Sequence, residues 1–373
     1  MTDFHARVPG NRVSLLHDSE RCLPALLESV AQAQVEVLLE MYWFGSDAWG
    51  RKFAAALADR ARHGVRVCVS YDAVGSFETD RAMFAELERA GCDVYEYNPL
   101  ELFSRRFSFR RMNRRNHRKL LIIDGKTAFT GGVNIGDPWG PESEGGKFRD
   151  DLIRVDGPAA ASMRAIFVNS FRGKNADTLR GTTLPIAPNA GSSTVEVLTN
   201  QGFKKRRVIE HAYLERIHAA TRCVLITNSY FIPRAKVRRA LAQAVTRGVD
   251  VRVLLPTVSD VPAVTYATRR MYGTLLRSGV QLFEWSQSIL HSKTAAVDGV
   301  WCTLGSHNLD YRSWAYNLEL NVMVEDVDVA MALERRMLSD MERSGRVDLR
   351  TWQFRPLGER ILEELFYLLR RFL

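Results

Sequence analysis

Two stretches of the chain carry the same pattern of ionisable and amide side chains. The pattern is a histidine, a lysine two residues later, an aspartate five residues after the lysine, and an asparagine ten residues after the aspartate. At this composition, the number of matches to the pattern expected by chance is on the order of 10⁻⁵, so the two copies are not a coincidence. The two copies are His117, Lys119, Asp124 and Asn134, and His291, Lys293, Asp298 and Asn308.

These residue types suit the chemistry of a phosphodiester. Side chains two positions apart lie on one face of a β-strand, so each copy presents an imidazole beside an ammonium group. A glycine pair or a Gly-Ser pair before each asparagine allows a tight turn that returns an amide donor to the same place. Two such strands that face each other across a two-fold axis would form one anion-binding pocket.

In such a pocket, ammonium and amide groups stabilise the non-bridging oxygens as charge builds up in the transition state. One imidazole attacks phosphorus, while the other protonates the leaving oxygen and later activates the acceptor. His117 and His291 are the candidates for these two roles. Because the built-in cations supply the charge that a metal ion would bring, the sequence predicts neither a metal nor another cofactor. The candidate phosphate-binding residues are Lys119, Lys293, Asn134 and Asn308.

A nucleophilic histidine also needs a carboxylate that holds its second ring nitrogen. Asp150, 33 residues after His117, and Glu319, 28 residues after His291, are the carboxylates best placed in the repeat for this role, with Asp151 as an alternative to Asp150.

The motif aspartates, Asp124 and Asp298, each precede a glycine at a predicted turn. They are counted with the candidate catalytic residues as members of the motif. Their position at a turn nevertheless favours the capping of backbone N–H groups.

The rest of the sequence is also organised as a repeat. The chain has 373 residues, 46% hydrophobic and 25% charged, which excludes collagen-like, low-complexity and disordered proteins. Strand-like and helical segments alternate in each half, which predicts βαβ units. The segments are 35–44, 50–62, 64–71 and 91–97 in the first half, and 223–232, 235–246, 248–256 and 279–285 in the second.

This order predicts an α/β fold of two similar lobes related by pseudo-two-fold symmetry, each with a mostly parallel or mixed sheet flanked by helices. Residues 1–172 are expected to form the N-terminal lobe with the first motif. Residues 194–373 are expected to form the C-terminal lobe with the second motif and a C-terminal amphipathic helix. The segment 173–193 is rich in Thr, Asn, Pro, Gly and Ser and is the expected linker.

The formal net charge of +9 predicts attraction to polyanions, either nucleic acid or an anionic membrane. No run approaches the roughly 18 apolar residues of a transmembrane helix, and the N-terminal stretch lacks the apolar core of a signal peptide, so we expect a cytosolic protein. The five cysteines are odd in number and scattered, which argues against a disulfide framework and a zinc site.

Two segments are candidates for membrane attachment, and each has an alternative. A cluster of arginines and apolar residues before the first motif fits a solvated loop, an anionic lipid surface or single-stranded nucleic acid. The C-terminal segment has apolar residues at helical spacing, which fits core packing, a dimer face or an interfacial membrane helix. The residues are Arg105, Arg106, Arg110, Arg111, Arg114, Arg115 and Arg118 with Phe103, Phe107, Phe109 and Met112, and then Ile361, Leu362, Leu365, Phe366, Leu368, Leu369 and Phe372.

The doubled motif resembles the phospholipase D superfamily, whose signature is a pair of HKD motifs. In that family the histidine of the first motif usually forms the phosphohistidine, which implies His117 as nucleophile and His291 as acid and base. The symmetry of the two motifs leaves the reverse assignment open.

A longer resemblance extends along nearly the whole chain to bacterial cardiolipin synthases of the shorter type, which lack paired N-terminal membrane helices. Two positions depart from the family pattern, with Gly132 where Ser is frequent and Phe148 where Trp is frequent. The segments that carry the resemblance are EMYWFGSD, HRKLLIIDGKTAFTGGVNIGD, NSYFIP, RGVDVRVLLPTVSD and LHSKTAAVDGVWCTLGSHNLDYRSWAYNLELNV.

This resemblance implies a phosphatidyltransferase that transfers a phosphatidyl group to the glycerol hydroxyl of phosphatidylglycerol or to a related alcohol. It implies a phospholipid substrate, an anionic membrane surface as partner, no nucleic acid, and a peripheral location on the cytoplasmic face of the cell membrane. Two alternatives use the same site: hydrolysis of a phospholipid by water, and cleavage of nucleic acid by a phosphodiesterase or nuclease. The oligomeric state is left open.

Overall fold

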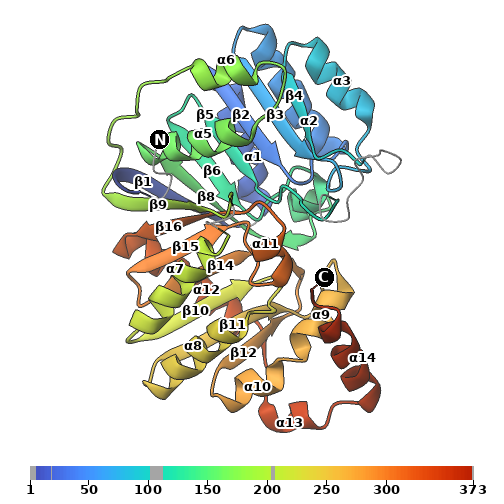
Figure 1. Cartoon of the computed structure of the whole chain (residues 1–373), viewed down its shortest axis with the longest axis vertical. Coiled ribbons are helices and arrows are strands. Elements are labelled where there is room, and N and C mark those ends of the chain that lie inside the picture. The colour runs from blue at the N-terminus through green and yellow to red at the C-terminus, as the bar shows by residue number, and fades with distance from the viewer. Residues whose placement is uncertain (1–5, 18, 101–111, 203–205, 372–373) are drawn as a thin grey trace.

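A computed structural model describes residues 6–17, 19–100, 112–202 and 206–371. Its central feature is one mixed sheet that runs through both halves of the chain and has fifteen strands among the described residues. At the middle of this sheet, β1 (Arg7–His17) pairs antiparallel with β9 (Ser193–Thr199). Figure 1 shows the first half of the chain above this pair and the second half below it.

The two halves build the sheet in the same order, outward from β1 and β9. The further strands of the first lobe are β2 (Glu36–Met41), β3 (Arg66–Asp72), β4 (Asp93–Tyr97), β5 (Leu120–Ile123), β6 (Thr127–Gly131) and β8 (Asp151–Asp156). Those of the second lobe are β10 (Cys223–Asn228), β11 (Asp250–Pro256), β12 (Gln281–Trp285), β14 (Lys293–Val297), β15 (Trp301–Gly305), β16 (Leu320–Glu325) and the short β17 (Gly345–Arg346). The order is β1-β8-β6-β5-β2-β3-β4 in the first lobe and β9-β16-β15-β14-β10-β11-β12 in the second, with β17 at its edge.

The sheet is mixed within each lobe. Three outer strands run parallel, β2-β3-β4 in one lobe and β10-β11-β12 in the other, because helical crossovers connect them. The strands between them and the central pair are antiparallel. The prediction of two similar α/β lobes with pseudo-two-fold symmetry is therefore confirmed, and so are the predicted outer strands.

Helices cover both faces of the sheet because the outer strands are apolar on both sides. In the first lobe, Val37 and Leu39 pack under helices on one face, while Leu38 faces the other. In the second lobe, Val224 and Leu225 divide in the same way. The helices are α1 (Ser19–Ala31), α2 (Ala48–Arg62), α3 (Arg81–Arg89), α5 (Ala159–Ser170), α6 (Ala176–Gly181), α7 (Val208–Ala219), α8 (Ala235–Thr246), α9 (Pro262–Arg269), α10 (Tyr272–Arg277), α11 (Tyr311–Ala315), α12 (Val327–Glu342), α13 (Leu349–Gln353), α14 (Leu357–Leu368) and the 3₁₀ turns Asp137–Trp139 and Glu142–Glu144.

The lobes share one hydrophobic core on the face covered by α5 and α12. Buried side chains of both helices belong to a single cluster that includes residues from both halves of the sheet. Helix α5 contacts the second-lobe strand β9, and α12 contacts the first-lobe strand β1. The two lobes are therefore packed as one body.

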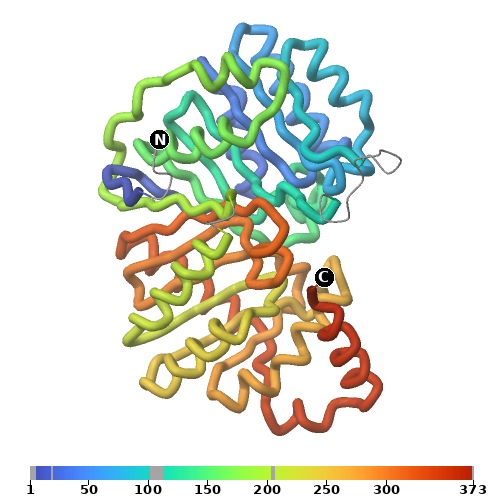
Figure 2. The backbone as a smooth tube through the Cα atoms, viewed as in Figure 1, coloured from blue at the N-terminus to red at the C-terminus, as the bar shows by residue number. Residues whose placement is uncertain are grey.

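The segment 173–193, predicted as the linker, contains α6 and then runs without regular structure to the start of β9. Figure 2 traces it along the outside of the first lobe to the junction. At the other end of the chain, α14 packs against α9. Within the described ranges, no helix combines the length and the apolar character required to cross a bilayer.

Candidate active site

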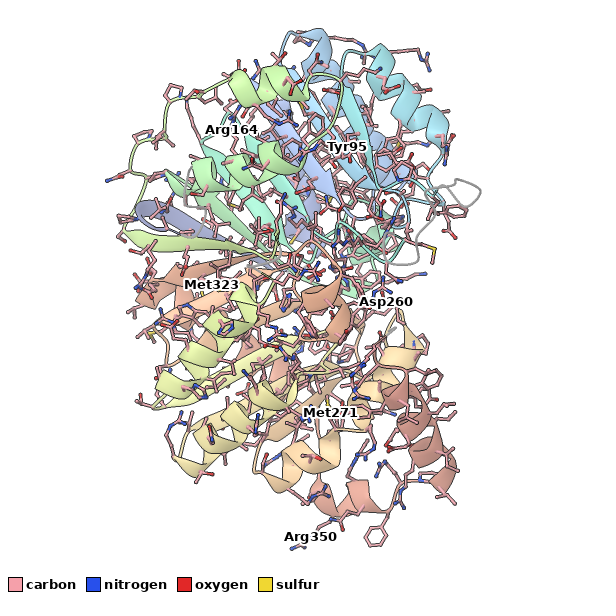
Figure 3. All side chains as sticks on the ribbon, in the orientation of Figure 1. Tyr95, Arg164, Asp260, Met271, Met323 and Arg350 are labelled. Atoms are coloured by element: carbon pink, nitrogen blue, oxygen red, sulfur yellow. The ribbon has the colours of Figure 1, made fainter. Side chains whose placement is uncertain are left out.

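Both motif histidines line one cavity between the lobes. Its volume is about 490 Å³, within the usual range for ligand pockets. Asp260, labelled in Figure 3, lies in its wall where the two lobes meet. The lining residues that matter below are Tyr42, Trp43, Arg115, His117, Asn134 and Trp139 from the first lobe, and Tyr230, Asp260, His291, Asn308, Asp310 and Arg312 from the second.

The backbone of each motif histidine is held by the opposite lobe. His117 N–H donates to the carbonyl oxygen of Leu318 at 3.0 Å, next to a parallel bridge between Asn116 and Leu318. In the symmetric position, β13 (Ile289–Leu290) pairs with β7 (Phe148–Arg149), and His291 N–H donates to the Arg149 carbonyl at 2.8 Å. These short contacts fix both histidines at the junction.

The carboxylates that orient the histidines also come from the opposite lobe. His117 Nδ1 lies 3.1 Å from both carboxylate oxygens of Glu319, and His291 Nδ1 lies 2.7 Å from Asp150 Oδ2. The sequence spacing predicts a pairing within each half, His117 with Asp150 and His291 with Glu319. The structure corrects this pairing to a crosswise one, because Asp150 and Glu319 directly follow the segments that bridge to the other lobe.

Asp151, the alternative to Asp150, has different partners. It accepts hydrogen bonds from Ser292 Oγ and His17 Nδ1 and pairs with Arg149. Arg149 is itself buried and donates to Ser292 and to Asp340 of α12. This network ties the two lobes together directly behind His291.

The motif aspartates hold the far ends of the motif strands. Asp124 and Gly125 have φ values of 53° and 65°, as in a type I′ hairpin turn, and join β5 to β6. The carboxylate of Asp124 accepts hydrogen bonds from the three N–H groups of residues 34–36, which lead into β2. Asp298 repeats this arrangement with the N–H groups of residues 221–223. The structure therefore corrects their inclusion among the catalytic groups, since each carboxylate is engaged at the end of its strand opposite the histidine.

The motif lysines are buried next to the histidines. Nζ of Lys119 donates to the His117 carbonyl oxygen at 2.8 Å, and Nζ of Lys293 donates to the His291 carbonyl oxygen. Burial and the charge of Lys293 lower the pKa of Lys119 to about 7. Burial lowers the pKa of Lys293 to about 8, although nearby carboxylates oppose this shift. An anionic ligand would restore the charged form of both ammonium groups.

The motif asparagines also line the cavity. Asn134 Oδ1 accepts a hydrogen bond from the Trp43 N–H at 3.2 Å, and Asn308 Oδ1 accepts one from Ser229 Oγ at 2.8 Å. With each oxygen held in this way, the NH₂ group is the donor that the side chain presents. Both asparagines can therefore bind a phosphate oxygen, as their spacing predicts.

The two histidine–carboxylate pairs differ in the pKa of the carboxylate. Burial raises the pKa of Glu319, but the neighbouring His117 more than offsets this and brings it down to about 2. Burial raises the pKa of Asp150 to about 6. Burial also lowers the pKa of both histidines, which keeps the imidazoles neutral in the absence of substrate. His117 is therefore a neutral imidazole held by an ionised carboxylate.

Several residues of the site have no signal in the motif spacing. Ser306 donates its hydroxyl hydrogen to Glu319, whereas the matching residue in the first motif is Gly132. A side-chain carbon at Gly132 would lie 2.2 Å from an Asp150 oxygen, and Trp139 Nε1 binds that carboxylate instead, at 3.1 Å. The indole and the Phe148 ring both meet the His291 ring edge-on at 5.5 Å. Only comparison of the two motif copies, Gly-Ser against Gly-Gly, hints at this difference.

The arginine cluster before the first motif is in part buried. Arg115 lies 3.4 Å from Asp72 and Arg118 lies 3.6 Å from Glu40, all of them within the protein interior. The structure therefore corrects the assignment of these two arginines to a membrane-facing surface. Arg114 is exposed. The cluster residues Phe103, Arg105, Arg106, Phe107, Phe109, Arg110 and Arg111 lie outside the described part of the chain.

In the described ranges, no three His, Cys, Asp or Glu side chains come together as metal ligands. The positive charge next to the histidines comes from Lys119 and Lys293, both almost fully buried.

Comparison with known proteins agrees with this architecture. A family profile described as "Cardiolipin synthase, PLD-like domain" matches residues 26–140 and 213–341, one segment in each lobe. A cardiolipin synthase of Geobacillus sp. (strain WCH70) is 33% identical over 95% of this chain and 71% of its own length. A probable cardiolipin synthase of Bacillus subtilis (strain 168) is 30% identical over 95% of this chain and 70% of its own.

Solved structures share the fold at low sequence identity. Phosphatidylserine synthase of Haemophilus influenzae superposes with a TM-score of 0.76 at 14% identity, covering 99% of this chain and 97% of its own. Polyphosphate kinase of Porphyromonas gingivalis gives a TM-score of 0.55 at 15% identity, covering 88% of this chain and 50% of its own. Taken with the profile match in both lobes and the extent of the curated relatives, the chain belongs to the family of cardiolipin synthases with a PLD-like domain.

Proposed function

We propose that this protein is a phosphatidyltransferase of the cardiolipin synthase type. It transfers a phosphatidyl group from one phospholipid to the glycerol hydroxyl of phosphatidylglycerol, or to a related alcohol, through a covalent phosphohistidine. The observation that carries the proposal is the single cavity lined by His117 and His291, each held by a carboxylate of the opposite lobe. The names of the curated relatives support the choice of a phospholipid as substrate.

In the first half-reaction, Nε2 of His117 attacks phosphorus. The N–P bond forms, the bond to the leaving oxygen breaks, and the leaving oxygen takes a proton from His291. The negative phosphodiester raises the pKa of His291 when it binds, so that the imidazole carries the proton it must donate. The ammonium and amide donors of the two motifs stabilise the non-bridging oxygens.

In the second half-reaction, the acceptor hydroxyl attacks the phosphohistidine. Its oxygen forms the new bond to phosphorus, its proton passes to His291, and the electron pair of the N–P bond returns to His117. The ionised carboxylate of Glu319 favours His117 as the nucleophile, because it stabilises the positive charge that the ring acquires when phosphorylated.

One experiment separates this proposal from its alternatives. Purified protein is incubated with phosphatidylglycerol vesicles and, separately, with single-stranded DNA, each with and without excess EDTA, and the products are identified by mass. Free glycerol and a four-chain lipid, formed equally in EDTA, support the proposal. Phosphatidic acid as the main product would indicate a hydrolase, and cut DNA with unchanged vesicles would indicate a nuclease.

The shifted pKa values predict a narrow pH optimum for kcat/KM. Below the pKa of about 6, Asp150 becomes protonated, so His291 loses the carboxylate anion that holds it. Above the pKa values of about 7 and 8, Lys119 and Lys293 lose the charge that binds phosphate. We therefore expect kcat/KM to fall on both sides of about pH 7.

The measurement is a pH series of initial rates at low and at saturating substrate. The basic limb of kcat should lie at higher pH than that of kcat/KM, because a bound phosphate raises the pKa of the lysines. A kcat/KM that is constant from pH 6 to pH 9 would contradict this account.

We further propose that α14 rests on an anionic membrane surface, which would place the protein on the cytoplasmic face of the cell membrane as a peripheral protein. One side of α14 packs on the protein, with Phe366 stacked on Tyr266 of α9 at 5.6 Å. The opposite side leaves Leu357, Ile361 and Leu365 exposed. The packed side agrees with the alternative of core packing, and the exposed apolar side supports the proposal of an interfacial helix. Phe372 lies outside the described residues.

The position and charge of α14 favour a lipid surface as the occupant of this apolar side. Helix α9 connects it to the cavity, because Val261 and Val264 at the start of α9 line the cavity wall. Arg360 and Arg371 are exposed on and beyond α14, and the chain as a whole is positive. An apolar ridge flanked by arginines is typical of helices that lie in an anionic lipid interface.

Replacement of Ile361 and Leu365 by serine is expected to weaken binding to phosphatidylglycerol vesicles tenfold or more, since each side chain contributes about 1 kcal/mol when it enters the interface. Cosedimentation with vesicles measures the effect. Ile186→Ser is the matched control, because Ile186 is a similarly exposed side chain on the segment outside the first lobe. Equal binding by the control and the double variant would contradict the proposal.

A further inference from the structure

One charged group in the cavity wall has no part in the chemistry described above. Asp260 follows β11 and directly precedes the segment that enters α9, and Figure 3 shows it at the junction of the lobes. The Tyr230 hydroxyl lies 2.8 and 2.7 Å from its two carboxylate oxygens and donates to them, and Ser259 Oγ donates at 3.1 Å. The carboxylate is therefore fixed in place within the cavity.

The carboxylate of Asp260 is a negative charge in a pocket for anions. Burial alone would raise its pKa, but its interactions with His291, the Tyr230 hydroxyl and Lys293 more than offset burial and lower it. An ionised carboxylate repels the phosphodiester and accepts hydrogen bonds from neutral donors. Its natural ligand in this cavity is therefore a hydroxyl group.

Among its described residues, the first lobe has no equivalent arrangement, although the motifs are symmetric. Val37 pairs with the residue six positions after His117, and Val224 with the residue six positions after His291. Six residues after each of these valines, just beyond the end of the strand, the first lobe has Trp43 where the second has Tyr230. The Trp43 ring packs on Trp139, and it offers no hydroxyl to hold a carboxylate.

The two sides of the cavity therefore differ in their side chains. On the His117 side, the Tyr42 ring lies 5.0 Å from the imidazole. On the His291 side, the carboxylate of Asp260 lies in the cavity wall, in addition to Asp150, which holds the imidazole. Asp310, also in the wall, is engaged differently, since it caps α11 through the Ser313 N–H at 2.8 Å.

We propose that Asp260, held by Tyr230, binds a second hydroxyl of the acceptor and so selects a polyol such as a glycerol group over a monohydric alcohol or water. The inference rests on the proposed transferase function and names its acceptor subsite. One acceptor hydroxyl attacks the phosphohistidine and gives its proton to His291, while the neighbouring hydroxyl donates a hydrogen bond to Asp260. The new O–P bond replaces the N–P bond, whose electron pair returns to His117.

A competition between two soluble acceptors tests this subsite. The enzyme reacts with phosphatidylglycerol vesicles in an equimolar mixture of deuterated glycerol and deuterated 1-propanol, and the two labelled lipids are quantified by mass. Both products arise from the same phosphoenzyme, so their ratio does not depend on the fraction of active protein. We expect the wild type to favour glycerol about tenfold and Asp260→Asn to bring the ratio close to one, because a hydrogen bond to a charged group is lost.

Further variants keep the result interpretable. Tyr230→Phe should lower the ratio in the same direction, Asp260→Glu should retain part of the preference, and Asp177→Asn, at an exposed site on α6, should leave it unchanged. The thermal midpoint of each variant reports its folding. A wild-type ratio near one, or an unchanged ratio in Asp260→Asn, would overturn the inference while labelled lipids still form. Absence of labelled lipids and of a four-chain lipid with the wild type would overturn the transferase proposal and the subsite with it.

Discussion

His117→Ala is expected to reduce phosphatidyl transfer by about 10⁴-fold or more, because it removes the group that forms the covalent intermediate. His117 is the neutral imidazole that an ionised Glu319 holds by its Nδ1, so its Nε2 is free to attack. The measurement is the initial rate with phosphatidylglycerol vesicles, together with a mass spectrum of the intact protein quenched in base, where a phosphohistidine survives.

His291→Ala is expected to lose natural turnover to a similar extent for a different reason. It removes the proton donor to the leaving oxygen and leaves the nucleophile in place. A phosphodiester with a p-nitrophenyl leaving group needs no proton donor, so His291→Ala should still release p-nitrophenol in a burst of one equivalent. His117→Ala should give no burst. His63→Gln, at the exposed C-terminal end of α2, is the control.

The reverse burst pattern would assign the nucleophile to His291. Wild-type transfer by either alanine variant would exclude the double-histidine mechanism altogether.

The second large effect is expected from the crosswise carboxylates. Glu319→Gln and Asp150→Asn should each lower turnover by about 10²–10⁴-fold, since an amide neither fixes the imidazole tautomer nor stabilises its charged form. Because Glu319 contacts His117 and Asp150 contacts His291, the two variants should fail at different steps.

The p-nitrophenyl donor separates these steps. Glu319→Gln should slow the burst itself, whereas Asp150→Asn should leave a fast burst and slow the turnover that follows. Glu86→Gln, at an exposed position of α3, serves as the matched control. If the pairing followed the order in the sequence, Asp150→Asn would be the variant with the slow burst.

Much of the fold could be predicted from the sequence because its signals are local. The alternation of buried strands with amphipathic helices places β2, β3, β10 and β11 correctly, since neighbouring residues decide each element. The central pair β1 and β9 has no such local signal, because each of its strands is completed by strands from a distant part of the chain.

The residues of the site also divide into those with a local sequence signal and those whose partners lie far away in the chain. His117 and His291 could be identified because motif spacing is a property of one segment. Their carboxylate partners could not be assigned, since a hydrogen bond between residues 202 positions apart depends on how the lobes meet. Arg118 also could not be placed, because an arginine in a basic run has the same sequence context whether it faces solvent or, as here, Glu40 in the interior.

Because each histidine is held by a carboxylate of the opposite lobe, the site requires both halves of the chain. A polypeptide of half this length would have a histidine without its carboxylate and an edge strand without its neighbour, so it could work only as a pair of identical subunits. Joining the two halves in one chain removes the requirement that they be identical. Each half is then free to acquire its own side chains, and Tyr230 with Asp260 on one side against Trp43 on the other is a difference that two copies of one gene product could never have.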